Sequence, residues 1–451
     1  MKILSIETSC DETAISIVEA NGDFGNANFK ILADNLISQI DIHKEYGGVF
    51  PALAKREHSK NLIPILRKTL NDAGFGNPVT KLKIGTLEVP ISEQIEKILE
   101  REPELLKMFL EYIPSIEIPE IDAIAVTQGP GLEPALWVGI NFAKALSLVW
   151  NKPVIPVNHM EGHLFSAFIN GKKFSTCLPV DIFPIVALLI SGGHTELILM
   201  KAIGEYEKIG QTKDDAIGEA FDKVARMLNL SYPGGPEISK LAQLEREYRS
   251  RTTNNPYSDY GIKLPRPMLN TDDLDFSFSG LKTSVLYLIK NIKTNHENLD
   301  RFVVSPREDE KQGFSLTNST SQNSPLQNTR QFRNQNTEIE LPIEIKQKIA
   351  LEFEEAVNEV LVKKTLKAVE KFKAKTLILG GGVSANNYLR QNFQELENEN
   401  LKVFVPPASS STDNAVMIGV ASYFNYLKQK KEGQSLSSVI DLRADGNLNL
   451  D

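Results

Sequence analysis

Apolar and polar residues alternate near the start of the chain in a way that predicts two strands joined by a turn. Residues 3–6 and 14–18 are apolar, and the residues between them are mostly polar. The same plan returns within residues 185–200, around a glycine-containing turn at 191–195. A third glycine-rich turn, at 380–384, follows another apolar run. Because similar units occur in both halves, the pattern predicts a duplicated architecture with a cleft between two lobes.

Further apolar runs alternate with helical patterns between these units. Residues 121–126 and 154–157 are predicted strands, and a predicted helix between them ends at Trp150. Residues 219–230 place Phe221 and three aliphatic side chains on one face, as in an amphipathic helix. Strands that alternate with helices predict mixed α/β layers.

The chain divides into two expected lobes and a tail. We expect a first lobe at 1–158, a second lobe at 159–430 and a C-terminal tail at 431–451. Residues 75–120 contain an amphipathic helix pattern but no chemical motif, which predicts a helical insertion. Residues 300–340 are rich in Ser, Asn, Gln and Thr, which predicts a flexible surface insertion because so little apolar surface can be buried.

The composition limits the class of protein. The chain has 451 residues, of which 41% are hydrophobic, so it can bury a sizeable core. Its two cysteines, Cys10 and Cys177, cannot form a disulfide framework, and we expect a reducing, cytoplasmic location. Acidic residues near the N-terminus exclude a signal-peptide core, and no apolar run reaches the roughly 18 residues of a membrane span. The net charge of −8 argues against a broad nucleic-acid surface on this chain alone.

Two of the six histidines lie four residues apart, at His159 and His163. On a helix this spacing places both imidazoles on one face, where they can share a metal ion. Asn158 is a favourable N-cap residue for such a helix. The stretch resembles the zinc-protease motif His-Glu-x-x-His, but Glu161 lies two positions after His159, roughly 200° around the helix. We therefore expect a metal site without a protease base; the alternative is two surface histidines at this spacing by chance.

A metal held by two imidazoles commonly takes a carboxylate as a third ligand. The candidate is Asp413, which follows Pro406 and Pro407. Its ordinary role would be to cap the helix expected from Ala415. From the residues alone we favour the cap, because caps are far more frequent than metal ligands.

Several residues could bind a phosphate or a nucleoside. The glycines at 191–193 and 380–382 would let a phosphate approach backbone N–H groups, although neither turn matches a P-loop or a full dinucleotide-binding motif. Asp222 could accept hydrogen bonds from ligand hydroxyls or form a salt pair with Arg226. Asn386 could cap a helix or contact a ligand. No Gly-x-Ser-x-Gly segment is present, so serine hydrolysis is poorly supported.

Seven motifs occur in the order of one known family, and together they are far more specific than any single turn. They are Ile6-Glu7-Thr8-Ser9-Cys10-Asp11-Glu12-Thr13, His159 to His163, Ser191-Gly192-Gly193-His194-Thr195, Gly218 to Lys223, Tyr232 to Pro236, Phe276 to Lys282 and Gly381 to Asn386. The chain closely resembles the tRNA adenosine threonylcarbamoyltransferases, a family long misnamed O-sialoglycoprotein endopeptidase. The resemblance covers nearly the whole chain except the two insertions and the tail.

The resemblance implies a two-lobed, duplicated α/β fold of the actin, Hsp70 and sugar-kinase type (ASKHA, ribonuclease H-like) with an interlobe cleft. It implies transfer of a threonylcarbamoyl group from threonylcarbamoyl-AMP to N6 of the adenosine just 3′ of the anticodon, in tRNAs that read codons starting with A. The family's metal ligands fall on His159, His163 and Asp413, which reverses the preference for a cap at Asp413. The positions that bind the intermediate fall on Leu189, Ile190, Ser191, Gly192, Gly193, Asp222, Gly235 and Asn386.

The same resemblance implies several partners: tRNA, a paralogous partner of the same fold, a small ATPase and a separate enzyme that makes the adenylate. A set of two histidines and one carboxylate with open positions favours Fe²⁺, with Zn²⁺ as the other candidate. His194 and Glu12 are candidates for proton transfer. The chain departs from the family at Glu133-Pro134, where a small glycine-containing run is common, and at Ser411, where a cysteine is common. The competing hypotheses are a metalloprotease and a non-catalytic nucleotide-binding scaffold.

Overall fold

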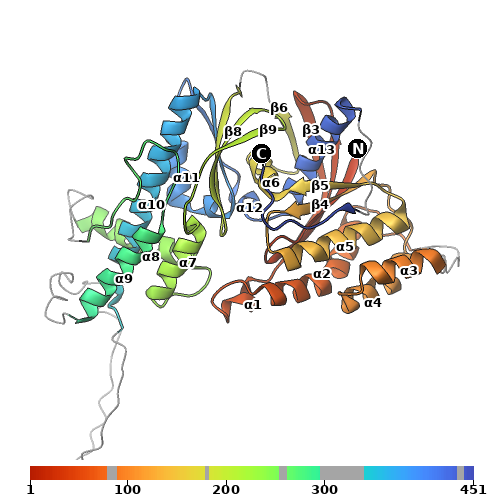
Figure 1. The fold of residues 1–451 in the computed structure, drawn as a ribbon, viewed down its shortest axis with the longest axis horizontal. Helices are drawn as coiled ribbons and strands as arrows, with labels where there is room; N and C mark the ends of the chain where they lie inside the picture. Colours follow the sequence, from red (N-terminus) through yellow and green to blue (C-terminus); the bar gives the residue numbers. More distant parts are fainter. Residues whose placement is uncertain (79–88, 178–181, 253–261, 295–339, 434–440, 451) are drawn as a thin grey trace, which may run out of the picture.

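A computed structural model provides the fold. It describes residues 1–78, 89–177, 182–252, 262–294, 340–433 and 441–450. Two sheets, each covered by helices, lie side by side in Figure 1, with the helices of the second lobe on the left and those of the first lobe on the right. Within the described ranges, no helix combines the length and the apolar character needed to cross a bilayer.

The first sheet contains six strands in the order β5-β4-β1-β2-β3-β6. They are β1 (Lys2–Glu7), β2 (Glu12–Asn21), β3 (Asn26–Ser38), β4 (Ala123–Gly129), β5 (Val154–Asn158) and β6 (Lys173–Cys177). β1 is antiparallel to β2 and parallel to β4. Both β1 and β4 are buried almost throughout, which explains why the sequence there is a nearly continuous apolar run.

The second sheet contains five strands in the order β11-β10-β7-β8-β9. They are β7 (Ile185–Ile190), β8 (Thr195–Ala202), β9 (Glu205–Gln211), β10 (Thr376–Gly380) and β11 (Lys402–Phe404). β7 is antiparallel to β8 and parallel to β10. The order β5-β4-β1-β2-β3 of the first sheet is therefore repeated, strand for strand, as β11-β10-β7-β8-β9. The predicted duplicated, two-lobed α/β fold is confirmed.

Helices pack on the outer faces of both sheets and between them. They are α1 (Ile40–Lys44), α2 (Pro51–Asp72), α3 (Val89–Ile98), α4 (Pro103–Tyr112), α5 (Glu133–Trp150), α6 (His159–Ser166), α7 (Ile217–Met227), α8 (Gly234–Thr252), α9 (Ser279–Thr294), α10 (Ile343–Phe372), α11 (Asn387–Gln394), α12 (Ala408–Ser411) and α13 (Ala415–Lys431), with short 3₁₀ turns at Ile113–Ser115 and Gly382–Ala385. α2 and α5 contact the first sheet, and α10 contacts the second. α6 contacts strands of both sheets, and α13 packs on α6 and the first sheet.

A buried apolar layer joins the two lobes around α6 and α13. Phe165 of α6 stacks on Phe424 of α13, with ring centroids 4.6 Å apart. Ile3 from the first sheet and Ile185 and Ile378 from the second belong to the same cluster and are fully buried. Because both sheets contribute side chains to this layer, α6 has a fixed position relative to each lobe.

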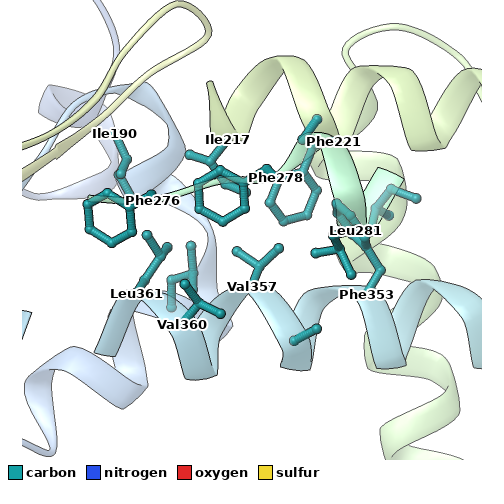
Figure 2. Packing of buried hydrophobic residues seen from close by; sticks show 14 of the residues in the cluster. Ile190, Ile217, Phe221, Phe276, Phe278, Leu281, Phe353, Val357, Val360 and Leu361 are labelled. Carbon is teal, nitrogen blue, oxygen red and sulfur yellow. The ribbon is translucent and has the colours of Figure 1, made fainter. Parts of the chain in front are cut away.

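A second cluster of aromatic and aliphatic residues fills the second lobe (Figure 2). The edge of Phe221 on α7 packs against Phe353 on α10, with centroids 5.1 Å apart and planes at 87°. Phe276 and Phe278 stack at 6.1 Å beside them. The predicted amphipathic face within residues 219–230 is confirmed, because its apolar side chains are all buried in this cluster.

The lobes do not divide the chain at residue 158. β6 lies beyond that residue yet pairs with β3, and α13 packs on the first sheet although it follows the whole second sheet. The first lobe therefore consists of two separate segments, because the apolar face of α13 is buried against β1 and β2.

The two expected insertions differ in what the structure describes. Within residues 75–120, α3 and α4 form, and Ile95, Leu105 and Phe109 are fully buried in the first-lobe core. The described helices of this segment, α3 and α4, are part of the core of the lobe. The segment 300–340 lies outside the described residues apart from its last residue, Glu340.

Candidate metal centre and ligand-binding turns

His159 and His163 lie on one face of α6, one turn apart. The helix begins directly after β5, and the Oδ1 atom of Asn158 accepts hydrogen bonds from the backbone N–H groups of Met160 (2.8 Å) and Glu161 (3.4 Å). This is the N-cap that the sequence predicts. The two imidazole rings are 4.6 Å apart between centroids, and both residues are buried. The alternative of two chance surface histidines is therefore wrong.

Asp413 reaches the same point from the segment between α12 and α13. Its Oδ1 atom lies 3.3 Å from Nε2 of His159 and 3.2 Å from Nε2 of His163. The cap of α13 is the neighbouring residue, Asn414, whose Oδ1 accepts from the N–H of Met417 at 3.0 Å. The capping role that the residues alone favour for Asp413 is thus wrong, and its carboxylate is free to face the histidines.

The three side chains fit a divalent cation. One nitrogen or oxygen atom from each of His159, His163 and Asp413 lies within 4.8 Å of the others. Ligands of one metal at bond lengths of about 2.1 Å are about 3.0–3.4 Å apart, which the two histidine–aspartate distances match. Nδ1 of His163 is buried without a hydrogen bond to any described residue, and Nε2 faces Asp413 at 3.2 Å without hydrogen-bond geometry. Such an orphaned imidazole is costly unless another partner binds it.

A second carboxylate, Glu7, lies behind His159. Oε2 of Glu7 lies 3.1 Å from Nδ1 of His159 and accepts a 2.6 Å hydrogen bond from Oγ1 of Thr127. Oε1 accepts from the backbone N–H of Ser9. A carboxylate on the outer nitrogen of a metal-binding histidine fixes the ring and leaves the inner nitrogen free for the metal. Glu7 belongs to the first of the seven motifs, but the sequence assigns it no role of its own; its position at the end of a buried strand is the available signal.

Charges in the centre shift the pKa values of its residues. Burial would lower the pKa of His159, but the charges on Asp413 and Glu7 outweigh it and raise that pKa well above the ordinary value. Burial would raise the pKa of Asp413, but the two histidines lower it below its usual range. Burial lowers the pKa of His163. The charges of the two carboxylates, Glu7 and Asp413, therefore dominate the centre, and this negative charge favours a cation.

Replacing Glu7 by Gln is expected to weaken Zn²⁺ binding by about 10- to 100-fold, because the ring of His159 loses its charged acceptor. The dissociation constant of the purified variant, measured by competition with a chromophoric chelator, checks this. Glu102→Gln is the matched control, since Glu102 is also a buried carboxylate in the first lobe but pairs with Lys55 at 3.1 Å. Equal affinity in both variants would exclude an orienting role for Glu7.

Glu161 points away from the metal centre. Its Oε1 accepts from the hydroxyl of Tyr206 at 2.8 Å, and its Oε2 accepts from Nδ2 of Asn425 at 2.9 Å. The side chain is buried, and burial raises its pKa. As expected from its helical position, Glu161 contacts neither His159 nor His163 and cannot activate a water on a metal there.

The glycine turns differ in how much open space they face. A Cβ atom added to Gly192 or Gly193 would meet no atom within 4 Å, so backbone of this turn is open to a ligand. A Cβ at Gly381 would lie 2.4 Å from the carbonyl oxygen of Ile190, so this glycine is needed for packing. Leu189 and Ile190 are fully buried at the end of β7, which leaves only their backbone for contact with a ligand.

Asp222 and Asn386 both bind neighbouring turns or helices. Oδ1 of Asp222 accepts from the N–H of Gly234 at 2.7 Å, and the adjacent Gly235 faces open space. Asn386 caps α11 with its Oδ1, and its Nδ2 donates to Ser239 (2.7 Å) and Glu354 (2.9 Å). Both amide hydrogens of Asn386 are therefore already used, whereas Asp222 keeps one carboxylate oxygen for a ligand.

His194 and Glu12 titrate far from their usual ranges. Burial, together with the neighbouring imidazoles of His159 and His163, lowers the pKa of His194 to about 4. Burial, together with the charges of Asp11 and Asp413, raises the pKa of Glu12 to about 10. At neutral pH His194 is uncharged, so its imidazole keeps an unprotonated nitrogen, and Glu12 holds its proton and can donate a hydrogen bond.

Comparison with solved structures gives only distant likenesses. YeaZ from Pseudomonas aeruginosa is 13% identical, with a TM-score of 0.24, over 46% of this chain and 68% of that one. HypF from T. kodakarensis is 12% identical, with a TM-score of 0.43, over 76% of this chain and 45% of that one. At such TM-scores these likenesses do not establish the fold, which rests on the two sheets described above.

Comparison with protein sequences gives much closer relatives. A protein of Thermosipho africanus is 38% identical over 98% of this chain and 100% of its own length. Proteins of Persephonella marina and Staphylococcus haemolyticus are 35% and 34% identical over 100% of this chain and 95% and 96% of theirs. All three are named tRNA N6-adenosine threonylcarbamoyltransferase. The profile of the family with that description matches residues 30–80 and 100–420. The chain belongs to the tRNA N6-adenosine threonylcarbamoyltransferase family.

Proposed function

We propose that this protein transfers a threonylcarbamoyl group from threonylcarbamoyl-AMP to N6 of the adenosine just 3′ of the anticodon, in tRNAs that read codons starting with A. Family membership supports the activity as a transferase of tRNA. The observation that carries the proposal is the convergence of His159, His163 and Asp413 at one point between the lobes. AMP is the leaving product.

The reaction is an acyl transfer that needs little from a nucleophilic side chain. The adenine amine attacks the carbamoyl carbon, a C–N bond forms, and the C–O bond to the AMP phosphate breaks. AMP is an acidic leaving group, so positioning and charge stabilisation supply most of the catalysis. A divalent metal, Fe²⁺ by preference and Zn²⁺ as the alternative, would supply Lewis-acid polarisation when held by His159, His163 and Asp413.

The residues around the metal ligands have complementary tasks in this proposal. The open backbone at Gly192 and Gly193 binds the phosphate, and the free oxygen of Asp222 accepts a ribose hydroxyl. His194 accepts the proton that the amine loses, and Glu12 donates a hydrogen bond because its pKa is about 10. Leu189, Ile190, Gly235 and Asn386 complete the predicted set around the intermediate; for Asn386 the side-chain contacts leave backbone contact as the available mode.

The proposal includes partners and a compartment. The net charge of −8 offers little attraction for tRNA phosphates, so a paralogous partner of the same fold and a small ATPase are proposed to complete the tRNA-binding assembly. A separate enzyme would make the adenylate. The scarcity of cysteine, two in 451 residues, is compatible with work in the cytoplasm.

Nucleoside mass spectrometry tests the function directly. The purified protein, with its proposed partners and with separately synthesised threonylcarbamoyl-AMP, is incubated with unmodified tRNA, which is then digested to nucleosides. We expect threonylcarbamoyladenosine in tRNAs that read codons starting with A, and equimolar AMP. A tRNA in which the adenosine 3′ of the anticodon is replaced by guanosine is the matched control. Absence of the modified nucleoside under all partner combinations would reject the proposal.

Replacing Glu161 by Gln separates the transferase from a metalloprotease. Among the described residues, the side chain of Glu161 accepts hydrogen bonds from Tyr206 and Asn425. The variant is therefore expected to keep its metal and its transfer rate within about threefold, with a modest loss of stability of about 1 kcal/mol. A zinc protease deprived of its base would lose peptide hydrolysis. Parallel assays of transfer and of protein cleavage decide the matter, and chelator-sensitive cleavage lost in the variant would favour the protease. A non-catalytic scaffold would show neither activity.

A further inference from the structure

Residues 441–450, called the tail below, run along the first lobe and end close to α6 (Figure 1). Leu442 and Ala444 pack against the first-lobe core, and Leu450 packs against the apolar layer that joins the lobes. Apolar side chains thus hold the tail at both of its ends, and the residues between them pass α6, the helix that carries His159 and His163.

The backbone of the tail fits closely on the loop that follows β4. The N–H of Asp445 donates to the carbonyl of Gln128 at 3.0 Å, and the carbonyl of Gly446 accepts from the N–H of Gly131 at 3.2 Å. A Cβ atom at Gly129 would lie 1.8 Å from the carbonyl oxygen of Asp445. The absence of a side chain at Gly129 is therefore required for the tail to occupy this position.

Asn449 connects the tail to both lobes. Its carbonyl oxygen accepts a 2.9 Å hydrogen bond from Nδ2 of Asn158, the residue whose Oδ1 caps α6. Its side-chain Oδ1 accepts from Nζ of Lys208 on β9 at 3.0 Å. An Asn side chain can turn over and exchange its donor and its acceptor. The carbonyl oxygen of Asn449 accepts from Nδ2 of Asn158 and so fixes which way this amide is turned. Oδ1 of Asn158 then stays on the N–H groups of the first turn of α6.

The tail also forms a wall of a cavity beside the metal centre. The cavity has a volume of about 190 Å³ and is lined by Pro130, Met160, His194 and Glu196 on the lobes and by residues 447–450 on the tail. Met160 lies between the two metal-binding histidines in sequence, and His194 is the proposed proton acceptor. His194 therefore lines a space that the tail helps to enclose.

We infer that the tail is a positioning segment of the transfer site. Through Asn449 it fixes Asn158, the N-cap of α6, and it encloses the cavity that His194 lines. Its catalytic consequence rests on the proposed function. Its structural consequence concerns only the first turn of α6, which carries His159. Without the tail, Asn158 loses the partner that orients its amide, and the turn that presents His159 opens more often.

A single added methyl group tests this in the full-length chain. Gly129→Ala is expected to displace the tail, since the new Cβ would collide with Asp445. In the metal-free protein, hydrogen exchange of the amides of Met160 and Glu161 should then become about tenfold faster. Zn²⁺ affinity should fall about tenfold, and the visible absorption bands of bound Co²⁺ should shift. Gly48→Ala is the matched control, because Gly48 has a φ of 157°, close to the 155° of Gly129, but faces no atom within 4 Å.

A truncated chain that ends at Ala444 keeps the anchors in the first-lobe core and should reproduce the three effects of Gly129→Ala. Exchange at α6 and a Co²⁺ spectrum equal to wild type in both variants would overturn the inference. Transfer is measured separately with synthetic threonylcarbamoyl-AMP. If the wild-type protein itself transfers no threonylcarbamoyl group, the proposed function fails. Hydrogen exchange at α6 and the absorption of bound Co²⁺ still test the role of the tail. If wild type and variants transfer equally, the positioning role fails alone.

Discussion

Replacing His163 by Ala is expected to remove the bound metal and to slow threonylcarbamoyl transfer by about a thousandfold. Two ligands would remain, and the Lewis-acid contribution to the transition state, several kcal/mol at 1.36 kcal/mol per factor of ten, would be lost. The fold should persist, because Nδ1 of His163 makes no hydrogen bond to a described residue and Nε2 faces Asp413, whose carboxylate keeps His159 as a neighbour. Metal content by mass spectrometry and the initial rate of transfer measure both effects.

His43→Ala is the matched control for the loss of a buried histidine. His43 is fully buried in the first lobe, and its Nε2 lies 3.2 Å from Oε1 of Gln39. Among the described residues, its ring nitrogens form no hydrogen bond with His159, His163 or Asp413. This variant should keep one full equivalent of metal. If His163→Ala kept its metal and the wild-type rate, the metal centre would have no part in the reaction.

Replacing Phe353 by Ala is expected to lower the free energy of unfolding by about 3–5 kcal/mol, because the substitution leaves a large cavity in a packed core. Phe353 is fully buried and contacts Phe221 edge to face in the centre of the second-lobe cluster (Figure 2). Urea unfolding followed by circular dichroism measures the change. The variant should still bind Zn²⁺ with wild-type affinity below the unfolding transition, since no metal ligand lies in this cluster.

An exposed aromatic residue provides the comparison. Tyr287 on α9 is 65% exposed, so Tyr287→Ala should change the free energy of unfolding by less than about 0.5 kcal/mol. A loss below about 1 kcal/mol for Phe353→Ala would mean that the second lobe repacks around the missing ring. In that case the cluster in Figure 2 would be less rigid than its edge-to-face contact indicates.

The local features of the fold could be predicted from the sequence because they depend on neighbours in the chain. The strand–turn–strand units at 3–18 and 185–200 follow from short apolar runs, and the shared face of His159 and His163 follows from their spacing on a helix. The role of Glu161 could also be judged correctly, since its angular position on α6 is fixed by its sequence position.

Features that depend on distant parts of the chain could not be predicted from the residues alone. Nothing in the pattern around Asp413 distinguishes a helix cap from a residue facing two histidines, and only the family resemblance pointed to the second. The pairing of β6 with β3 and the return of α13 to the first sheet are equally invisible to local pattern. The same holds for Glu7, whose partner His159 is far along the chain.

The return of α13 to the first sheet has a consequence for biosynthesis. The first sheet lacks α13, one of the helices that cover it, until residues 415–431 have left the ribosome, and Asp413 emerges only just before them. A nascent chain that already contains both histidines still lacks the carboxylate that completes their site. Binding of a cation through all three side chains therefore has to follow synthesis of the chain through Asp413, and products terminated before that residue would not capture metal in this way.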